Sequence, residues 1–290
     1  MTFENEGVDV IVRFHDVART RELTRAVFSL YGQELRPVRI LLVLQRFSEE
    51  DEASVRAALA PLLSLPDAPD LTICRHDSPL PLDARSALVN LGLQAATARY
   101  VALLDYDDVL YPEAYRMLTE QLKESGAGIA FGNIGVKLVD VYDDFLHAHG
   151  QHSPFKGSTL TDLLRSNFCP IHSFVVDRAR VPASEMRFEP NQTIEEDYEF
   201  LLRVCACVKS DFTLVHTRIG EYYYKSDNSN TVGSNSVIPP ATRARIEAAV
   251  TFNEGRRRIT PLSAEVQEQL GLSEYRPALT IAAYLQEVSQ

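Results

Sequence analysis

Apolar residues follow two different spacings along the first third of the chain. In short runs they occupy consecutive positions, which is typical of strands covered on both faces in a parallel sheet. In the stretches between these runs they recur every three or four positions, which predicts helices. The predicted strands are residues 8–14, 38–45, 71–75 and 100–105, and the predicted helices are residues 20–31, 50–63 and 84–98. Strands and helices in this order predict an α/β, Rossmann-like fold with a parallel sheet and right-handed crossovers.

The same spacings extend the pattern through the rest of the chain. They predict strands at residues 128–136, 173–176 and 214–224, and helices at residues 112–124 and 194–208. The polar residues 140–157 predict a long loop or excursion. Because the composition changes near residues 237–240, we expect a main domain over 1–237 and a mainly helical extension over 238–290. Apolar positions at helical spacing predict that this extension forms short helices, packed on the main domain or on a second copy in a homo-oligomer.

The chain has 290 residues and a net charge of −11. An acidic protein repels phosphate groups, so we expect neither nucleic acid nor an anionic membrane surface as its main partner. The sequence has no apolar run of the roughly 20 residues that a membrane-spanning helix needs, and its first residues do not resemble a signal peptide. We therefore expect no integral membrane segment, and a cytoplasmic protein that is either free or peripheral at the inner face of the membrane.

Three acids lie at the end of the strand predicted at residues 100–105 and just after it, at positions Asp105, Asp107 and Asp108. In open α/β sheets, ligands bind at the carboxyl ends of the strands. Carboxylates this close together repel one another unless they are solvated, protonated or bridged by a cation, and oxygen ligands suit Mg²⁺ or Mn²⁺. The segment therefore predicts a site for a metal and a phosphate group. The open alternative is a solvated turn before the helix that begins near Pro112.

A second group of acids, Glu195, Glu196 and Asp197, lies at the start of the helix predicted at residues 194–208. Acids in the first turn of a helix are stabilised by the helix dipole, so this group also has a purely structural explanation. What favours a functional role is the order along the chain, in which an acidic loop after a buried strand is followed by acids that begin an apolar helix.

Over residues 8–235 the chain resembles the family 2 glycosyltransferases, which have a GT-A fold. Five parts of the sequence match motifs of this family, in the order that the family has them. The resemblance is carried by segments 8–12, 29–33 with 38–40, 85–92, 104–108 with Pro112, and 196–198 with Phe200 and Arg203. Segment 8–12 resembles the first nucleotide-binding strand of the family, and segment 85–92 is similar to its helix with a basic residue and Asn-x-Gly. Segment 104–108 resembles the DxD motif, and segment 196–198 resembles the Glu-Asp motif that carries the catalytic base.

The resemblance implies an inverting, non-processive glycosyltransferase that moves a sugar from a nucleotide-diphosphate donor to a carbohydrate or other hydroxyl acceptor, in glycan or polysaccharide biosynthesis. Asp107, helped by Asp105 or Asp108, would hold the Mg²⁺ or Mn²⁺ that neutralises the leaving diphosphate. Asp197 would take the proton of the acceptor hydroxyl, with Glu196 as the next candidate for the base. A processive synthase is disfavoured because its Gln-x-x-Arg-Trp motif cannot occur in a chain without tryptophan.

The resemblance also implies contacts to the donor and to the acceptor. Donor contacts are expected from Val12, Gln45, Arg85, Asp105 and Lys225. Gln45 lies where family members often have an acid that contacts the base of the nucleotide, so the identity of the base stays open, although an amide also hydrogen-bonds base edges. His172 is expected near the acceptor, with a structural role as its alternative.

Two other classes of protein stay open. A nucleotidyltransferase also has carboxylates and a metal at a strand end, but it usually needs a glycine-rich loop after its first strand, where this chain has none at residues 13–17. For the same reason a dinucleotide-binding domain is disfavoured. The second alternative is a non-catalytic GT-A-like subunit for binding or assembly, which is favoured by Gln45 and by the appended tail.

Overall fold

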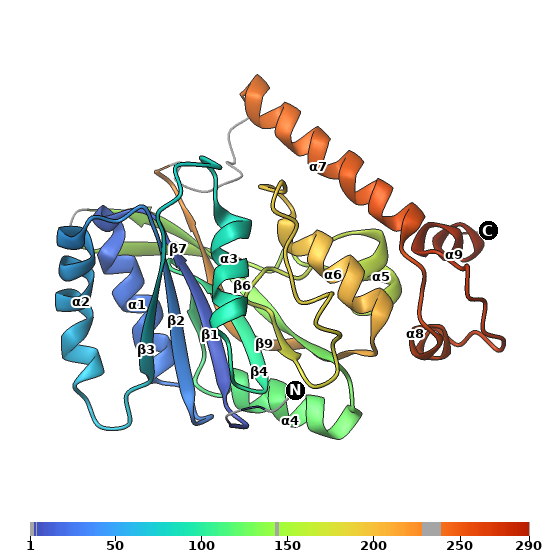
Figure 1. Cartoon of the computed structure of the whole chain (residues 1–290), viewed down its shortest axis with the longest axis horizontal. Helices are drawn as coiled ribbons and strands as arrows, with labels where there is room; N and C mark the ends of the chain where they lie inside the picture. The colour runs from blue at the N-terminus through green and yellow to red at the C-terminus, as the bar shows by residue number, and fades with distance from the viewer. Residues whose placement is uncertain (1–2, 4, 143–144, 228–238, 290) are drawn as a thin grey trace.

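The computed structural model describes residues 3, 5–142, 145–227 and 239–289. Within these residues, one mixed sheet of nine strands forms the centre of the molecule (Figure 1), in the order β3-β2-β1-β4-β8-β6-β9-β5, with β7 paired to β6. The strands are β1 Val8–Phe14, β2 Val38–Gln45, β3 Asp70–His76, β4 Tyr100–Asp105, β5 Val109–Leu110, β6 Ile129–Val141, β7 Leu146–His152, β8 Phe174–Asp177 and β9 Ser210–Lys225.

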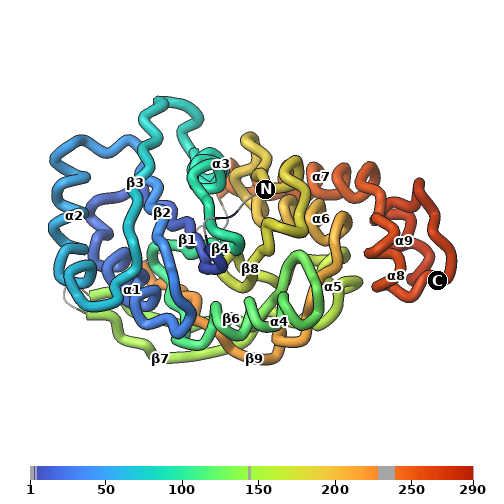
Figure 2. The backbone as a smooth tube through the Cα atoms, turned by 60° about the horizontal axis from the view of Figure 1, so that its bottom comes forward, coloured from blue at the N-terminus to red at the C-terminus, as the bar shows by residue number. Residues whose placement is uncertain are grey.

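Helices cover both faces of this sheet. They are α1 Thr20–Tyr31, α2 Glu49–Leu63, α3 Arg85–Ala95, α4 Ala114–Ser125, α5 Leu160–Arg165, α6 Glu196–Cys207, α7 Pro240–Ile259, α8 Ala264–Gln269 and α9 Ile281–Glu287, with a short 3₁₀ helix, Val17–Arg19, before α1. Alternate side chains of β1 point to opposite faces. Ile11 belongs to a core with α3, α5 and α6, whereas Val10 and Val12 belong to a core with α1, α2 and α4. Figure 2 shows α3 on one side of the sheet and α1 and α4 on the other.

Strands β1 to β4 are parallel to their neighbours in this group, as the alternation of strands and helices predicts. Their carboxyl ends therefore meet at one edge of the sheet. The register places Arg13 of β1 opposite Asp105 of β4, and Phe14 opposite Leu44 of β2. Residues far apart in the sequence thus reach the same edge, where the acidic loop after β4 also begins.

The structure corrects the sequence predictions in the middle of the chain. Residues 140–157 do not form a long loop, because the whole of β7 lies within them and pairs with β6 in antiparallel orientation. No residue of β7 is buried, and exposed polar residues such as His147 and His149 lie along it, so the sequence has no apolar run here that predicts a strand. The helix α5 was also not predicted. It begins with a capping box in which the Thr159 side chain accepts from the backbone N–H of Asp162.

The C-terminal helices pack on the rest of the molecule, as one of the two alternatives predicted. Leu262, Val266, Ile281 and Tyr284 are buried in the same core as α6. The prediction of short helices is wrong for α7, which has 20 residues. The proposed domain boundary stays a prediction, because most of the polar run at 225–236 lies outside the described residues. Among the described helices, none is both long and apolar enough to cross a membrane.

Candidate active site

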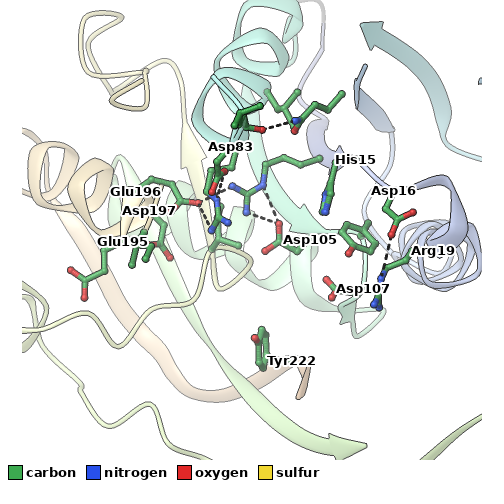
Figure 3. Close-up of a pocket in the computed structure, with 18 residues that line it drawn as sticks. His15, Asp16, Arg19, Asp83, Asp105, Asp107, Glu195, Glu196, Asp197 and Tyr222 are labelled. Atoms are coloured by element: carbon green, nitrogen blue, oxygen red, sulfur yellow. Dashed lines mark hydrogen bonds and ion pairs between the residues drawn. The ribbon is translucent and has the colours of Figure 1, made fainter. Parts of the chain in front are cut away.

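A cleft of about 820 Å³ opens at the carboxyl ends of β1, β2 and β4. It is lined by residues that follow these strands, by the start of α3 and by the start of α6. Figure 3 shows the acids at the start of α6 on one side of the cleft and the residues after β1 on the other, with Asp105 between them. The structure thus brings together the two groups of acids that the sequence predicted.

Arg13 joins these two groups of acids. Its Nη2 lies 2.7 Å from Oδ1 of Asp105, and its Nη1 lies 2.8 Å from Oε1 of Glu196. The guanidinium is almost buried, with 12% of the side chain exposed. Burial opposes the charge of Arg13, but the two carboxylates outweigh this effect and raise its pKa. The guanidinium of Arg13 therefore connects the end of β4 to the first turn of α6.

The loop after β4 presents two of its three acids to the cleft. Burial would raise the pKa of Asp105, but the charge of Arg13 outweighs it and holds this pKa below its usual value, so the carboxyl is ionised. Asp107 also lines the cleft, and its Oδ2 lies 2.5 Å from Nζ of Lys225 at the end of β9. Lys225, expected to contact the donor, is buried and paired with this acid instead.

Asp108 lies beneath the loop, outside the residues that line the cleft. Its Oδ1 accepts a hydrogen bond of 3.0 Å from the backbone N–H of Tyr223, which attaches β9 to the loop. Burial, together with the charges of Asp107 and Asp105, raises the pKa of Asp108 well above its usual value. Of the three acids expected at the metal site, Asp105 and Asp107 line the cleft and Asp108 does not.

His172, expected near the acceptor, is also buried and does not line the cleft. Its Nδ1 lies 3.5 Å from Oδ2 of Asp108, and burial lowers its pKa to about 4, so the ring is neutral. Ile171 lines the cleft in its place. Direct contact between His172 and an acceptor would require the buried segment to rearrange.

Asp105 and Asp107 provide oxygen ligands that suit Mg²⁺ or Mn²⁺. Arg13 binds Oδ1 of Asp105 and Lys225 binds Oδ2 of Asp107, and no side chain in the described part of the chain hydrogen-bonds the second oxygen of either carboxylate. No group of three or more acidic, histidine or cysteine side chains is arranged for a metal among the residues described. Two carboxylates completed by phosphate oxygens and water are the usual arrangement for Mg²⁺.

Asp197 lies in the first turn of α6 and lines the same cleft. Its Oδ1 accepts two hydrogen bonds, one of 2.7 Å from the backbone N–H of Tyr198 and one of 3.4 Å from Nδ2 of Asn167. Burial and, after it, the negative charge of Glu196 raise the pKa of Asp197 to about 7. A carboxyl with this pKa is able to exchange a proton near neutral pH, as a general base must.

The other expected donor residues divide into two groups. Gln45 and Arg85 line the cleft. Nε2 of Gln45 donates to the carbonyl of Leu82 at 3.0 Å, and Nε of Arg85 donates to Asp83 at 2.9 Å. Val12 is fully buried in the sheet and does not line the cleft, so the side chain of its neighbour Arg13 reaches the site instead.

The sequence interpretation gave no site role to several residues that line the cleft, above all Arg13, His15 and Glu195. A signal for Arg13 was present, because it is the only charged residue in the second half of an otherwise apolar strand and lies at the end where ligands bind. Glu195 gives a weaker signal, since its backbone φ of 55° lies in the left-handed region and cannot be read from the sequence.

The fold and the cleft define a class of protein. The model of the family "Glycosyl transferase family 2" matches residues 10–179, more than half of the chain, and the chain therefore belongs to this family. Within that class, the chain is 28% identical over 207 residues to the succinoglycan biosynthesis protein ExoO of Rhizobium meliloti (strain 1021). This match covers 69% of the chain but only 56% of that relative.

Solved structures with a similar fold include residues 1–349 of TarS from S. aureus. The complex of TarS with UDP-GlcNAc has a TM-score of 0.61 at 14% identity, covering 92% of this chain and 70% of that one. The complex with UDP has a TM-score of 0.59 at 13% identity, with the same coverage. At this level of identity the likeness shows the fold alone, which is the GT-A fold expected from the sequence.

Proposed function

We propose that this protein transfers a sugar from a nucleotide-diphosphate donor to a hydroxyl acceptor, in the synthesis of a polysaccharide. One observation carries the proposal: the cleft at the strand ends holds Asp105 and Asp107 of the acidic loop together with Asp197, a carboxyl whose pKa of about 7 suits a general base. Membership of family 2 supports the class of reaction. The name of the relative ExoO supports the pathway, and the complex of TarS with UDP-GlcNAc supports the kind of donor.

In the proposed reaction Asp197 accepts the proton of the acceptor hydroxyl while the hydroxyl oxygen attacks the anomeric carbon. The bond from this carbon to the diphosphate oxygen breaks, and the leaving nucleoside diphosphate keeps the electron pair. General base catalysis of this kind contributes about 10²- to 10⁴-fold in rate. A single displacement without a covalent intermediate inverts the anomeric configuration. Glu196 is less suited to be the base, because Arg13 already neutralises it.

The leaving diphosphate needs positive charge, which several groups in the cleft provide. Asp105 and Asp107 would hold a divalent cation, and this cation would neutralise the negative charge that develops on the diphosphate. Arg85 lies at the cleft wall, 4.0 Å from Glu196, where a guanidinium is able to pair with a phosphate. Lys225 would contact the diphosphate only after leaving Asp107, and a cation bound to that carboxylate favours this release because like charges repel.

Gln45 offers a contact for the base of the nucleotide. Its Nε2 donates to the carbonyl of Leu82, which leaves Oε1 as an acceptor at the cleft. Every nucleotide base offers a donor to such an acceptor, from a ring N–H in uracil and guanine or from an amino group in cytosine, adenine and guanine. Gln45 is therefore able to contact any of these bases, and the donor panel of the test decides which base is preferred.

The test uses the purified protein with Mn²⁺, a panel of UDP-, GDP-, CDP- and ADP-sugars, and oligosaccharide acceptors. Transfer of the sugar with release of nucleoside diphosphate is the expected result, and NMR of the product should show inverted anomeric configuration. Release of pyrophosphate would indicate a nucleotidyltransferase instead. A protein that binds the donor, but neither transfers its sugar to any acceptor nor hydrolyses it, would be a non-catalytic subunit.

A further inference from the structure

Helix α7 lies beside α6 and extends beyond it toward the end of the molecule where α3 begins (Figure 1). Its side chains contact the start of α6 and the residues before α3, which form two walls of the cleft. We propose that α7 is a positioning element of the active site, in which Asn253 fixes the start of α6 and Arg245 fixes both walls relative to each other. This inference rests on the glycosyl transfer proposed above.

Asn253 holds Glu195, the residue that precedes the two acids of α6. Its Nδ2 donates to Oε2 of Glu195 at 3.0 Å, and the asparagine is only 1% exposed. Glu195 has φ 55° and ψ 28°, a left-handed conformation that residues with a side chain rarely adopt. Such a conformation persists only where the surroundings hold it. The buried amide of Asn253 is one of the groups that hold it.

The conformation of Glu195 decides where α6 begins. Its carbonyl accepts the first helical hydrogen bond, 3.1 Å from the backbone N–H of Glu199. Glu196 and Asp197 follow directly, so a rotation of the Glu195 backbone moves both carboxylates relative to Arg13 and to the acidic loop. Displacements of about 1 Å in a catalytic group cost up to about 100-fold in rate. Asn253 therefore acts on the proposed base through Glu195 rather than by contact with substrate.

Arg245 connects the two walls of the cleft. Its Nη2 lies 2.6 Å from Oδ2 of Asp83, before α3, and 2.8 Å from Oγ1 of Thr193, before α6. Asp83 also accepts from Nε of Arg85, the proposed phosphate contact. Burial would raise the pKa of Asp83, but Arg85 and Arg245 together lower it, so the carboxylate stays ionised between the two guanidiniums. Arg245 thereby steadies the side chain of Arg85.

The composition of the contact face argues against a role for α7 in apolar packing alone. Only Ala249 and Asn253 are buried on this helix, whereas Val250 and Phe252 are exposed. Oδ1 of Asn253 has no hydrogen-bond partner among the described residues, so burial of this amide carries a cost in stability that an apolar residue would avoid. Asn253 thus lowers stability and contacts the residue at the start of α6, as expected of a residue that positions this helix.

The test compares Asn253→Ala in two backgrounds, the natural chain and Glu195→Gly. In the natural chain we expect kcat to fall about 10- to 100-fold with donor KM within about twofold, because the base is displaced while the donor site is intact. Glycine adopts positive φ without strain and has no carboxylate to hold. In the Glu195→Gly background, Asn253→Ala should therefore change kcat by less than about twofold. Equal losses in both backgrounds would overturn the proposal.

Hydrogen exchange of the unliganded protein gives a readout that does not depend on transfer. Asn253→Ala should speed exchange in peptides that cover residues 193–200, with no change in peptides that cover β1. Thr251→Ala is the matched control, because this exposed side chain on the same helix hydrogen-bonds, among the described residues, only to the carbonyl of Glu247. Unchanged exchange in residues 193–200 would refute the positioning role even if the wild-type protein transfers sugar. A wild-type protein that transfers no sugar would refute the proposed function, whatever the exchange shows.

Discussion

Replacement of Arg13 by methionine tests the bridge at the centre of the site. Arg13 pairs with Asp105 at 2.7 Å and with Glu196 at 2.8 Å, and the side chains of both acids are largely buried, with 29% and 6% exposed. Methionine keeps much of the volume but leaves two carboxylates close together, with Arg85, 4.0 Å from Glu196, as the remaining cation. Arg13→Met should therefore destabilise the fold as well as disturb the site.

The magnitude follows from the burial of the pairs. Removal of one partner of a buried ion pair costs about 3–5 kcal/mol, because the remaining charge is left uncompensated. Arg13 pairs with both acids, and Arg85 stays 4.0 Å from Glu196, so we expect a loss of about 3–5 kcal/mol in the free energy of unfolding at pH 7 rather than twice that value. The same change at an exposed pair costs about 0–1 kcal/mol.

Urea denaturation of the full chain measures this difference, with Arg116→Met as the matched control. Arg116 also pairs with two acids, Glu34 at 2.7 Å and Glu120 at 2.9 Å, but all three side chains are exposed. We expect Arg116→Met to change the free energy of unfolding by less than about 1 kcal/mol. Equal effects of the two substitutions would refute the conclusion that burial makes the Arg13 bridge important.

The effect of Arg13→Met should also depend on pH. Arg13 holds the pKa of Asp105 below its usual value. The stabilisation from such a group is present above the pKa of the unfolded chain and is lost as the pH falls through the folded value. The difference between the natural chain and Arg13→Met should thus be largest at neutral pH and shrink as the pH falls below about 4. A difference that stays constant as the pH falls from about 4 to about 2 would contradict this reasoning.

Three further predictions concern the acids and the tail. Asp107→Asn, which keeps an oxygen for Lys225, should abolish the gain in nucleotide affinity that Mn²⁺ brings in calorimetry; equal affinity in both proteins would exclude Asp107 as a ligand. The value of kcat/KM should rise as the pH passes about 7, where Asp197 loses its proton. The substitution Asp197→Asn should lower turnover at least about 100-fold. A flat pH profile, or normal turnover of Asp197→Asn, would exclude Asp197 as the general base. Truncation before Pro240 should lower the melting temperature, because Leu262 and Ile281 leave the core; an unchanged melting temperature would show that the tail contributes no stability.

The sequence by itself was sufficient for the elements that depend on local patterns. The bounds of β1, β2 and β4 match the predicted ranges, because consecutive apolar residues between polar turns mark a strand covered on both faces. Since the order of strands and helices predicts a parallel sheet, it also placed the acidic loop after β4 at the edge where ligands bind. The order of these segments was enough to suggest the family.

Only the tertiary structure decided which of these side chains act together. Three neighbouring acids look equivalent in the sequence, but packing turns Asp108 inward beneath the loop and leaves the other two at the cleft. Glu196, one of the two partners of Arg13, is 183 positions away. The contact of Asn253 with Glu195 comes from a helix to which the sequence interpretation assigned no chemistry. Local periodicity tells which face of an element is buried. The direction of a loop side chain and the partner of a charge depend instead on contacts between distant segments, and these form only when the chain packs.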